Sequence, residues 1–235
     1  MTDATTGTQE NSHDEVKRRL LEAYRFRHAV KDFDAERKLT AEDFAFILEA
    51  GRLSPSSYGF EPWRFVVVQS LELRDKIAPH AGGARRQLAS ASHVILVLAR
   101  LPREMVADSD YITHMLNEVQ RLPAEIAEMK RRTYDTFLRT GFALQDNERA
   151  MFEWACRQTY LALGNMMTAA AMLGIDSCPM EGFVKHELER VLTEEGLMDA
   201  ERFGLACMAA FGYRAPEGAV LPKTRQSLDD VVDWR

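Results

Sequence analysis

The stretch from Pro55 to Val68 concentrates side chains that could hold a planar ligand. Its first nine residues include two serines, one glycine, three aromatic residues and two prolines: Ser56, Ser57, Gly59, Tyr58, Phe60, Trp63, Pro55 and Pro62. Hydroxyls can bind polar groups, and aromatic rings stack on flat ligands. The pattern is typical of a loop that wraps a planar, phosphorylated molecule. A plain surface turn is the alternative, because such turns are also rich in Ser, Pro and Gly.

Basic side chains gather at two places far apart in the sequence. Arg25, Arg27 and Lys31 flank the segment His28-Ala29-Val30, and Lys223 and Arg225 lie near the C-terminus. Arginine binds phosphate through paired hydrogen bonds and stays charged. These residues are therefore candidates for a phosphate site, with solvated surface charges as the alternative.

A third candidate is the turn Pro179-Met180-Glu181-Gly182-Phe183, which follows an expected strand. A carboxylate beside a glycine at a strand end can present a backbone N–H to a ligand. The alternative is an ordinary strand-to-helix turn, with Glu181 near a helix start where the helix dipole favours negative charge.

Composition excludes several classes of function. The chain has 235 residues, 46% of them apolar, and a formal net charge of −6. The acidic balance argues against nucleic-acid binding, and the longest apolar runs are too short or too polar to cross a membrane. Cys156, Cys178 and Cys207 form no CxxC pair, so we expect buried, reduced thiols in a cytoplasmic protein, and no metal site.

Several familiar catalytic motifs are missing. No GxGxxG follows a strand, and neither a GxxxxGK[ST] loop nor a GxSxG elbow occurs. The histidines lack metal-ligand spacing. His93, at the start of an expected strand, is interpreted as a hydrogen-bonded structural histidine.

The hydrophobic pattern predicts one domain over residues 14–235, after a disordered lead over residues 1–13. Thr40 and Asp43 have capping-box spacing, and Gly174 should end a helix. Expected helices cover 14–24, 40–53, 71–77, 111–138, 147–173 and 184–192; expected strands cover 64–69, 93–99, 175–179 and 203–211. This mixture predicts an α+β sandwich with a mixed, mostly antiparallel sheet. The charged region 111–138, with few apolar anchors, is expected to be an excursion from the core or part of a partner contact.

The order of the motifs is more specific than any one of them. Arg27-His28-x-x-Lys31, Pro55-Ser56-Ser57, Pro62-Trp63, Ala91-Ser92-His93, Gly164-Asn165, Pro179-x-Glu181-Gly182 and Lys223-x-Arg225 follow one another along the chain. This series resembles the FMN-dependent nitroreductase family, in its oxygen-insensitive NAD(P)H branch, over about residues 14–226. The resemblance implies a three-layer sandwich in an intertwined homodimer with two FMN molecules at the interface. It also implies ping-pong hydride transfer from NAD(P)H to nitroaromatic, quinone or similar small-molecule acceptors.

The resemblance also implies roles for individual residues. Arg27, Lys223 and Arg225 would hold the FMN phosphate, Lys31 the pyrimidine edge, and the turn at Glu181 would offer an N–H to flavin N5. Ser56 and Ser57 would serve the FMN of the other subunit. The implied cofactor contacts are Arg27, His28, Ala29, Lys31, Pro55, Ser56, Ser57, Gly59, Gln87, Pro179, Met180, Glu181, Gly182, Lys223 and Arg225. No catalytic residue is assigned, because the flavin carries the redox chemistry while Lys31 and Glu181 tune and orient it.

The sequence departs from the family pattern at five places. Ala29 replaces a usual serine, Gly59 an asparagine, Glu61 a glutamine, and Ala84 and Gln87 an asparagine and a lysine that face the flavin. These changes leave the flavin potential, the physiological acceptor and the choice between NADH and NADPH open.

The acceptor pocket is expected to be apolar and open, with walls from both subunits. Tyr58 and Phe60 would come from the partner's loop, and Phe137 or Phe142 from the excursion. The alternative places Tyr58 and Phe60 in the dimer core. The helix around 154–173 is expected to form the interface, with Gly164 allowing close approach. Alternative functions within the same fold are reductive dehalogenation and flavin breakdown, and a non-enzymatic flavin-binding protein is a third possibility.

Overall fold

A four-stranded antiparallel sheet forms the centre of the protein. The computed structural model describes residues 6–218 and 220–235. The strands are β1 (Trp63–Val67), β2 (His93–Arg100), β3 (Asp176–Met180) and β4 (Phe203–Gly212), in the order β1-β2-β4-β3. Each adjacent pair is antiparallel. Pro179 is tolerated because β3 lies at an edge, where a missing N–H breaks no ladder on the outer side.

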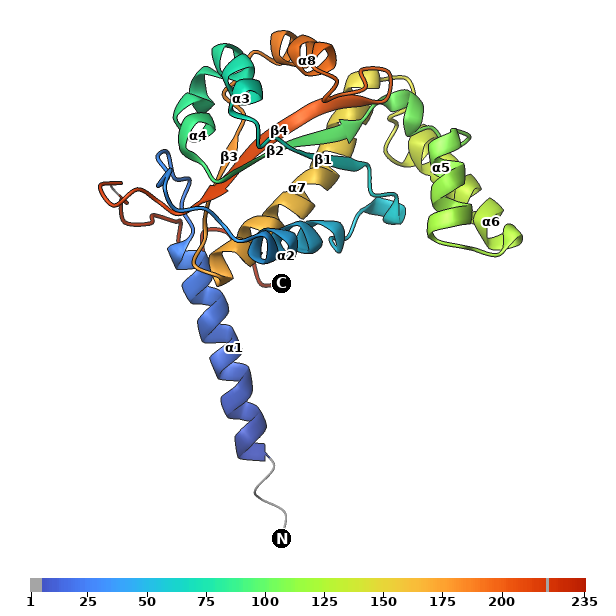
Figure 1. Cartoon of the computed structure of the whole chain (residues 1–235). Coiled ribbons are helices and arrows are strands. Elements are labelled where there is room, and N and C mark those ends of the chain that lie inside the picture. Colours follow the sequence, from blue (N-terminus) through green and yellow to red (C-terminus); the bar gives the residue numbers. More distant parts are fainter. Residues whose placement is uncertain (1–5, 219) are drawn as a thin grey trace.

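Helices cover both faces of this sheet (Figure 1). On one face lie α2 (Ala41–Arg52) and the long α7 (Glu148–Met172); on the other lie α3 (Leu71–Ile77), α4 (Arg85–Ser90) and α8 (Lys185–Glu194). Successive residues of β2 point to opposite faces. Its Leu96 accordingly joins the core cluster with α8, whereas Val97 joins the cluster with α2 and α7. This arrangement confirms the predicted α+β sandwich.

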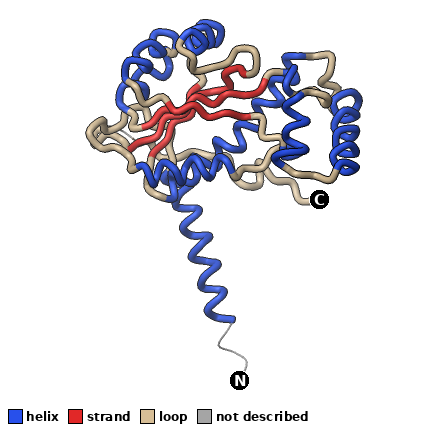
Figure 2. The backbone as a smooth tube through the Cα atoms, turned by 45° about the vertical axis from the view of Figure 1, so that its right-hand side comes forward, coloured by secondary structure: helices blue, strands red, loops and turns tan. Residues whose placement is uncertain are grey.

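The first helix, α1 (Thr6–Phe26), begins earlier than expected. Figures 1 and 2 show it projecting from the body of the protein. Residues 6–13, expected to be disordered, are helical; residues 1–5 lie outside the described residues. Ion pairs spaced three and four residues apart support the helix, as Arg18 contacts both Glu15 and Glu22 at 2.7 Å. The polar composition therefore concealed a helix that carries ion pairs along its own surface.

The region 111–138 also differs from the expectation of one long helix. It contains α5 (Asp110–His114), a π turn over Met115–Val119, α6 (Ala124–Thr136) and a second π turn over Phe137–Gly141. The break falls at Arg121, which has φ +50°, shortly before Pro123. The expectation of few apolar anchors was wrong, because the region contributes many side chains to a buried cluster. These side chains are Tyr111, Ile112, Met115, Leu116, Tyr134 and Leu138.

Local signals in the sequence mark several ends correctly. Thr40 caps α2 by accepting a hydrogen bond from the Asp43 N–H at 3.1 Å, and Gly174 follows α7 with φ +71°.

His93 is structural, as expected: its Nδ1 lies 3.0 Å from Ser92 Oγ and its ring stacks on Phe44 at 3.8 Å. Burial, with Arg74 and Lys38 nearby, lowers the pKa of His93 from 6.5 to about 4. In the described part of the chain no helix is both long and apolar enough to cross a bilayer.

A buried arginine connects the ends of β1, α4 and β2. Arg74, only 3% exposed, donates to the carbonyl oxygens of Val68, Leu88, Ala91 and Ser92 and to the side-chain oxygen of Gln69. Each of these acceptors sits where a strand or helix ends. Arg74 therefore satisfies backbone groups that the secondary structure leaves unpaired.

We predict that Arg74→Met destabilises the protein by roughly 3–5 kcal/mol, because several buried carbonyls would lose a charged donor. Urea unfolding at fixed protein concentration measures the change. Arg85→Met is the matched control, since Arg85 is exposed and donates only to Ala78 O at 3.3 Å. Equal stability of the two variants would contradict this role of Arg74.

Candidate active site

Basic residues from opposite ends of the chain meet beside the C-terminal end of α1. The Lys223 ammonium donates to the Arg27 carbonyl oxygen, and His28 Nε2 lies 3.2 Å from the Leu221 carbonyl oxygen. Burial, followed by the charges of Arg27 and Arg225, lowers the pKa of Lys223. Within the described residues none of these three cations forms an ion pair with an acid. The structure therefore concentrates positive charge that an anionic ligand could neutralise.

The sheet edge holds this segment in place. Ala29 forms a parallel bridge with Ser177 of β3, and the Val30 N–H donates to the Ser177 carbonyl at 3.3 Å. Beside it, Arg214 pairs with the buried Asp176, with Nη2 at 2.6 Å and Nε at 2.9 Å from the carboxylate oxygens. The same guanidinium lies 3.4 Å from the Phe26 carbonyl oxygen. The end of α1 is thereby fixed to the ends of β3 and β4.

Lys31 and Gln87 converge on one sulfur atom. Lys31 Nζ lies 3.9 Å from Cys178 Sγ, and Gln87 Nε2 lies 3.5 Å from the same atom. Lys31 is exposed, whereas Gln87 is only 1% exposed. In the single chain the Gln87 amide points at Cys178, and its direct contact with a ligand stays a prediction. Lys31 is the member of the pair that a ligand can reach.

The turn after β3 packs tightly on the glycine pair before α4. Gly83 N donates to Gly182 O at 2.9 Å, and a Cβ on Gly182 would lie 2.9 Å from Gly83 Cα. The Tyr160 hydroxyl of α7 donates to the Glu181 carboxylate, and this contact together with burial raises the pKa of Tyr160. In the described part of the chain, the backbone N–H groups of Glu181 and Gly182 have no acceptor. Both residues are exposed, so these donors can serve a ligand.

A cavity of about 240 Å³ lies beside the segment from His28 to Asp32. It is open to solvent and combines cationic, carboxylate and apolar groups, among them His28, Ala29, Lys31, Asp32, Arg214 and Leu221. On its wall, Asp32 receives a 2.6 Å hydrogen bond from Arg86 Nε of α4. Asp32 is therefore already paired with Arg86. Among the described residues, Lys31 lines the same wall and has no acid partner.

The loop after α2 lies elsewhere, towards α5 in Figure 1. It is docked on α7: Ser57 N donates to Gln158 Oε1 at 2.8 Å, and Asn165 Nδ2 donates to Ser54 Oγ at 2.8 Å. Pro55 is exposed, and Ser56 and Ser57 are half-buried. Within one chain, these residues have no recorded contact with the segment around Arg27.

The aromatic residues divide into a buried and an accessible part. Phe60 is 0% exposed and packs on Tyr134 at 4.8 Å, so it is enclosed within this chain and forms no open wall in this structure. Tyr58 is half-buried against Phe60, Tyr134 and Phe137. Phe142 is 52% exposed and stacks on Phe137 at 5.3 Å. Tyr58, Phe137 and Phe142 are the aromatic residues that remain accessible.

Comparison with known proteins assigns the family. A sequence profile described as "Nitroreductase family" matches residues 24–213. The chain is 47% identical over 220 residues to "Putative NAD(P)H nitroreductase YfkO" of Bacillus subtilis (strain 168), covering 94% of this chain and 99% of that protein. "Putative NAD(P)H nitroreductase SAUSA300_2462" of Staphylococcus aureus (strain USA300) is 47% identical over 215 residues, or 92% of this chain and 95% of that protein. The chain therefore belongs to the nitroreductase family and is an oxidoreductase.

Solved structures show the same fold. A crystal structure of ydfN from Bacillus subtilis superposes with a TM-score of 0.74 at 22% identity, covering 95% of this chain and 100% of the other. A structure described as a "putative nitroreductase in complex with FMN", from Exiguobacterium sibiricum, gives 0.72 at 23% identity, with coverage of 92% and 97%.

Sequence reasoning missed the residues that support this site. Asp176 and Arg214 are distant in sequence and carry no local motif, although an aspartate at the start of an apolar strand requires a partner. Gly82-Gly83 was a usable signal, since a glycine pair often marks a close backbone approach. Gln158 was hidden in the apolar pattern of α7, whereas Asn165 was noted in the Gly164-Asn165 motif but without its contact with Ser54.

We predict that Gly182→Ala lowers the free energy of unfolding by roughly 1–3 kcal/mol, because the new Cβ would collide with backbone rather than with a side chain. Gly82→Ala is the matched control, since a Cβ there meets nothing within 4 Å. Urea unfolding of both variants gives the comparison. If both variants had identical urea midpoints and slopes, the turn at Gly182 could move away from Gly83 without cost, and the prediction would be wrong.

Proposed function

We propose that the protein is an FMN-dependent oxidoreductase that transfers hydride from NAD(P)H to nitroaromatic, quinone or similar acceptors by a ping-pong mechanism. The observation that carries the proposal is the cationic cluster of Arg27, Lys223 and Arg225, next to an exposed lysine and a turn with free N–H donors. The relatives are named as NAD(P)H nitroreductases, and one structural neighbour was solved in complex with FMN; both support the same reaction class.

The residues of the cluster fit the parts of FMN. Arg27, Lys223 and Arg225 match a terminal phosphate, which binds best to charged donors. Lys31 matches the pyrimidine edge of the flavin, with Gln87 supporting it from behind through Cys178. His28, Ala29, Pro179 and Met180 would line the site. Among the described residues, the cluster of Arg27, Lys223 and Arg225 offers charge for one phosphate, which favours FMN over FAD.

When bound, the flavin would supply the hydride chemistry, while the protein supplies placement and electrostatics. The Lys31 cation would stabilise negative charge that develops at the pyrimidine edge. The N–H groups of Glu181 and Gly182 would be donors that orient the flavin ring. Tyr160 holds the Glu181 carboxylate, and Gly83 supports the turn from below.

The second half of the site requires a homodimer. Ser56, Ser57 and Gly59 lie away from the basic cluster of their own chain, so we propose that they serve the FMN of the partner. Large apolar side chains exposed on α2 and α7 support an extensive interface: Phe46, Leu53, Leu161, Met172 and Leu173. Tyr58, Phe137 and Phe142 would then form the partner's wall of the acceptor pocket, with Phe60 behind Tyr58.

The decisive experiment is to purify the protein, release its cofactor by heat and identify it by chromatography. We expect noncovalent FMN and steady oxidation of NAD(P)H when a nitroaromatic or quinone is added. FAD, or no flavin after reconstitution, would refute the cofactor assignment. NAD(P)H oxidation that no acceptor stimulates would refute the reaction.

Two variants then separate binding from chemistry. Arg225→Ala should weaken FMN retention by roughly 1.5–3 kcal/mol, the value of a charge-assisted hydrogen bond, with less effect on the reduction rate of the bound flavin. Lys31→Ala should do the reverse, because its charge acts when negative charge develops. FMN titration of the apoprotein and stopped-flow reduction by NAD(P)H measure these effects. Loss of FMN affinity alone in both variants would contradict the division of roles.

The interface is tested at Gly164 of α7. A Cβ there meets nothing within 4 Å in the single chain, so the fold itself tolerates a side chain. We predict that Gly164→Leu yields a folded protein that dissociates into monomers and loses flavin, because the added isobutyl group would block the partner's approach. Light scattering and circular dichroism report assembly and folding. A dimeric variant with full flavin content would exclude Gly164 from the interface.

A further inference from the structure

The loop after α2 has an unusual backbone. Tyr58 and Glu61, which are not glycines, have φ values of +58° and +45°, and Gly59 between them has φ +67°. Positive φ is unfavourable for a non-glycine residue and persists only where its surroundings enforce it. Two such residues within four positions therefore require an external restraint.

One restraint comes from the excursion between α5 and α6. Gln120 Nε2 donates to the carbonyl oxygens of both Tyr58 (3.1 Å) and Gly59 (2.9 Å). Lys130 Nζ of α6 donates to Gln120 Oε1 at 2.6 Å. An ammonium group can only donate, so it fixes the orientation of the Gln120 amide, with the oxygen towards Lys130 and the NH₂ towards the loop. No acid pairs with Lys130 in the described residues, and burial lowers its pKa.

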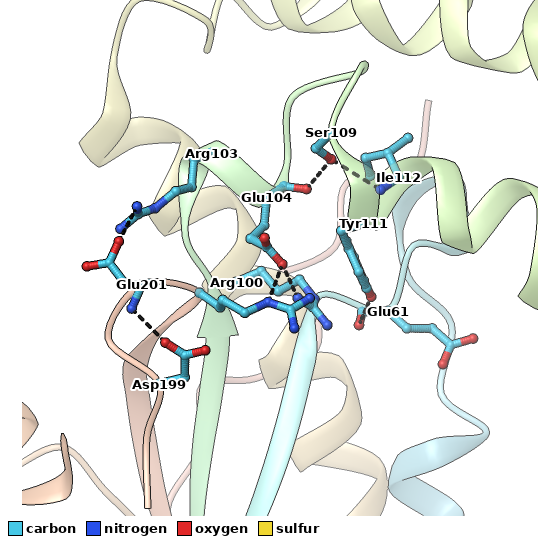
Figure 3. A network of polar contacts seen from close by, with 10 residues as sticks. Glu61, Arg100, Arg103, Glu104, Ser109, Tyr111, Ile112, Asp199 and Glu201 are labelled. Atoms are coloured by element: carbon cyan, nitrogen blue, oxygen red, sulfur yellow. Dashed lines mark hydrogen bonds and ion pairs between the residues drawn. The ribbon is translucent and has the colours of Figure 1, made fainter. Parts of the chain in front are cut away.

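A second restraint acts on the other end of the loop. The Tyr111 hydroxyl lies 2.5 Å from the Phe60 carbonyl oxygen and 2.8 Å from that of Glu61. Figure 3 shows Tyr111 directed at Glu61, with Arg100 beside it in a network through Glu104. The Arg100 guanidinium stacks 3.4 Å from the Tyr111 ring. The carbonyls of the loop from Tyr58 to Glu61 are thus held from the excursion.

We propose that Gln120, oriented by Lys130, is a specificity-determining positioning residue that sets the place of the Tyr58 ring in the acceptor pocket. The proposal rests on the proposed function, in which Tyr58 faces the partner's flavin. The Tyr58 ring follows its backbone, because left-handed φ at residues 58 and 59 directs it onto Phe137. We call the two hydrogen bonds from Gln120 to the Tyr58 and Gly59 carbonyls the clamp. Loss of the clamp would let the loop relax and would change which planar acceptors fit.

The sharpest variant is Gln120→Glu. It keeps the shape of the side chain and its contact with Lys130, but replaces the NH₂ donor with an oxygen that repels the two carbonyls. Lys130→Met removes the ammonium and lets the Gln120 amide turn, so we expect a smaller effect in the same direction. Arg132→Met is the control, because Arg132 lies on the same helix, is exposed and reaches only Glu128, at 3.8 Å.

Two readouts are needed. Amide hydrogen exchange of the segment 57–63 measures the clamp directly, and we expect about tenfold faster exchange in Gln120→Glu than in wild type or Arg132→Met, reflecting local opening. The ratio of kcat/KM for a nitroaromatic to that for a quinone measures specificity. We expect it to change by about threefold or more, with FMN content intact, because pocket contacts discriminate substrates through differential binding.

The outcomes separate the two proposals. If wild type reduces no acceptor, the proposed function fails, and unchanged exchange in Gln120→Glu then also overturns the clamp. If wild type is active, faster exchange together with an altered acceptor ratio supports the proposal. Unchanged exchange, or faster exchange with an unaltered ratio, overturns it. Equal changes in Arg132→Met would attribute the effect to helix α6 as a whole and overturn the role of Gln120.

Discussion

The buried ion pair between Arg214 and Asp176 is the constraint on which the site depends. Asp176 is only 2% exposed, and a carboxylate removed from water is tolerated only with a charged, hydrogen-bonded partner. Arg214 supplies that partner just after β4, and its guanidinium also reaches the Phe26 carbonyl at the end of α1. One interaction thus joins the two strands and the first helix. The segment from Arg27 to Lys31 starts from that junction and has little freedom to lie anywhere else.

The proposed binding residues form two groups that do not meet within the described part of the chain. The first is assembled from the N-terminal segment, the turn after β3 and the C-terminal tail; the second sits on the loop after α2, anchored to α7 by Gln158 and Asn165. Both groups are fixed to the same sandwich, so their separation is set by the fold. Under the proposed dimer, neither subunit could bind or turn over substrate alone, which would couple activity to assembly.

The sequence predicts features that depend on local chemistry. The Thr40 cap, the α3 bounds and the Gly174 helix end match because each depends on residues within one turn. The motif order was sufficient to indicate the family. Features that depend on distant partners could not be predicted: Phe60 packs on Tyr134 and the Gln87 amide points at Cys178, and both partners lie far along the chain. The six-residue α4 was missed because it is too short to show a period, and the excursion was misread because its anchors face one another across a break at Arg121.

The burial of the cysteines has a practical consequence. Cys156, Cys178 and Cys207 are all buried and unpaired, and burial raises the pKa of Cys156 and of Cys207 to about 12. Thiolates, which are the species that alkylating reagents attack, are therefore scarce at those two positions near neutral pH, and Cys178 is shielded by its packing. The native chain is thus a ready background for site-directed labelling: a single cysteine introduced on the excursion or on α1 could carry a fluorophore or spin label without first removing the natural three.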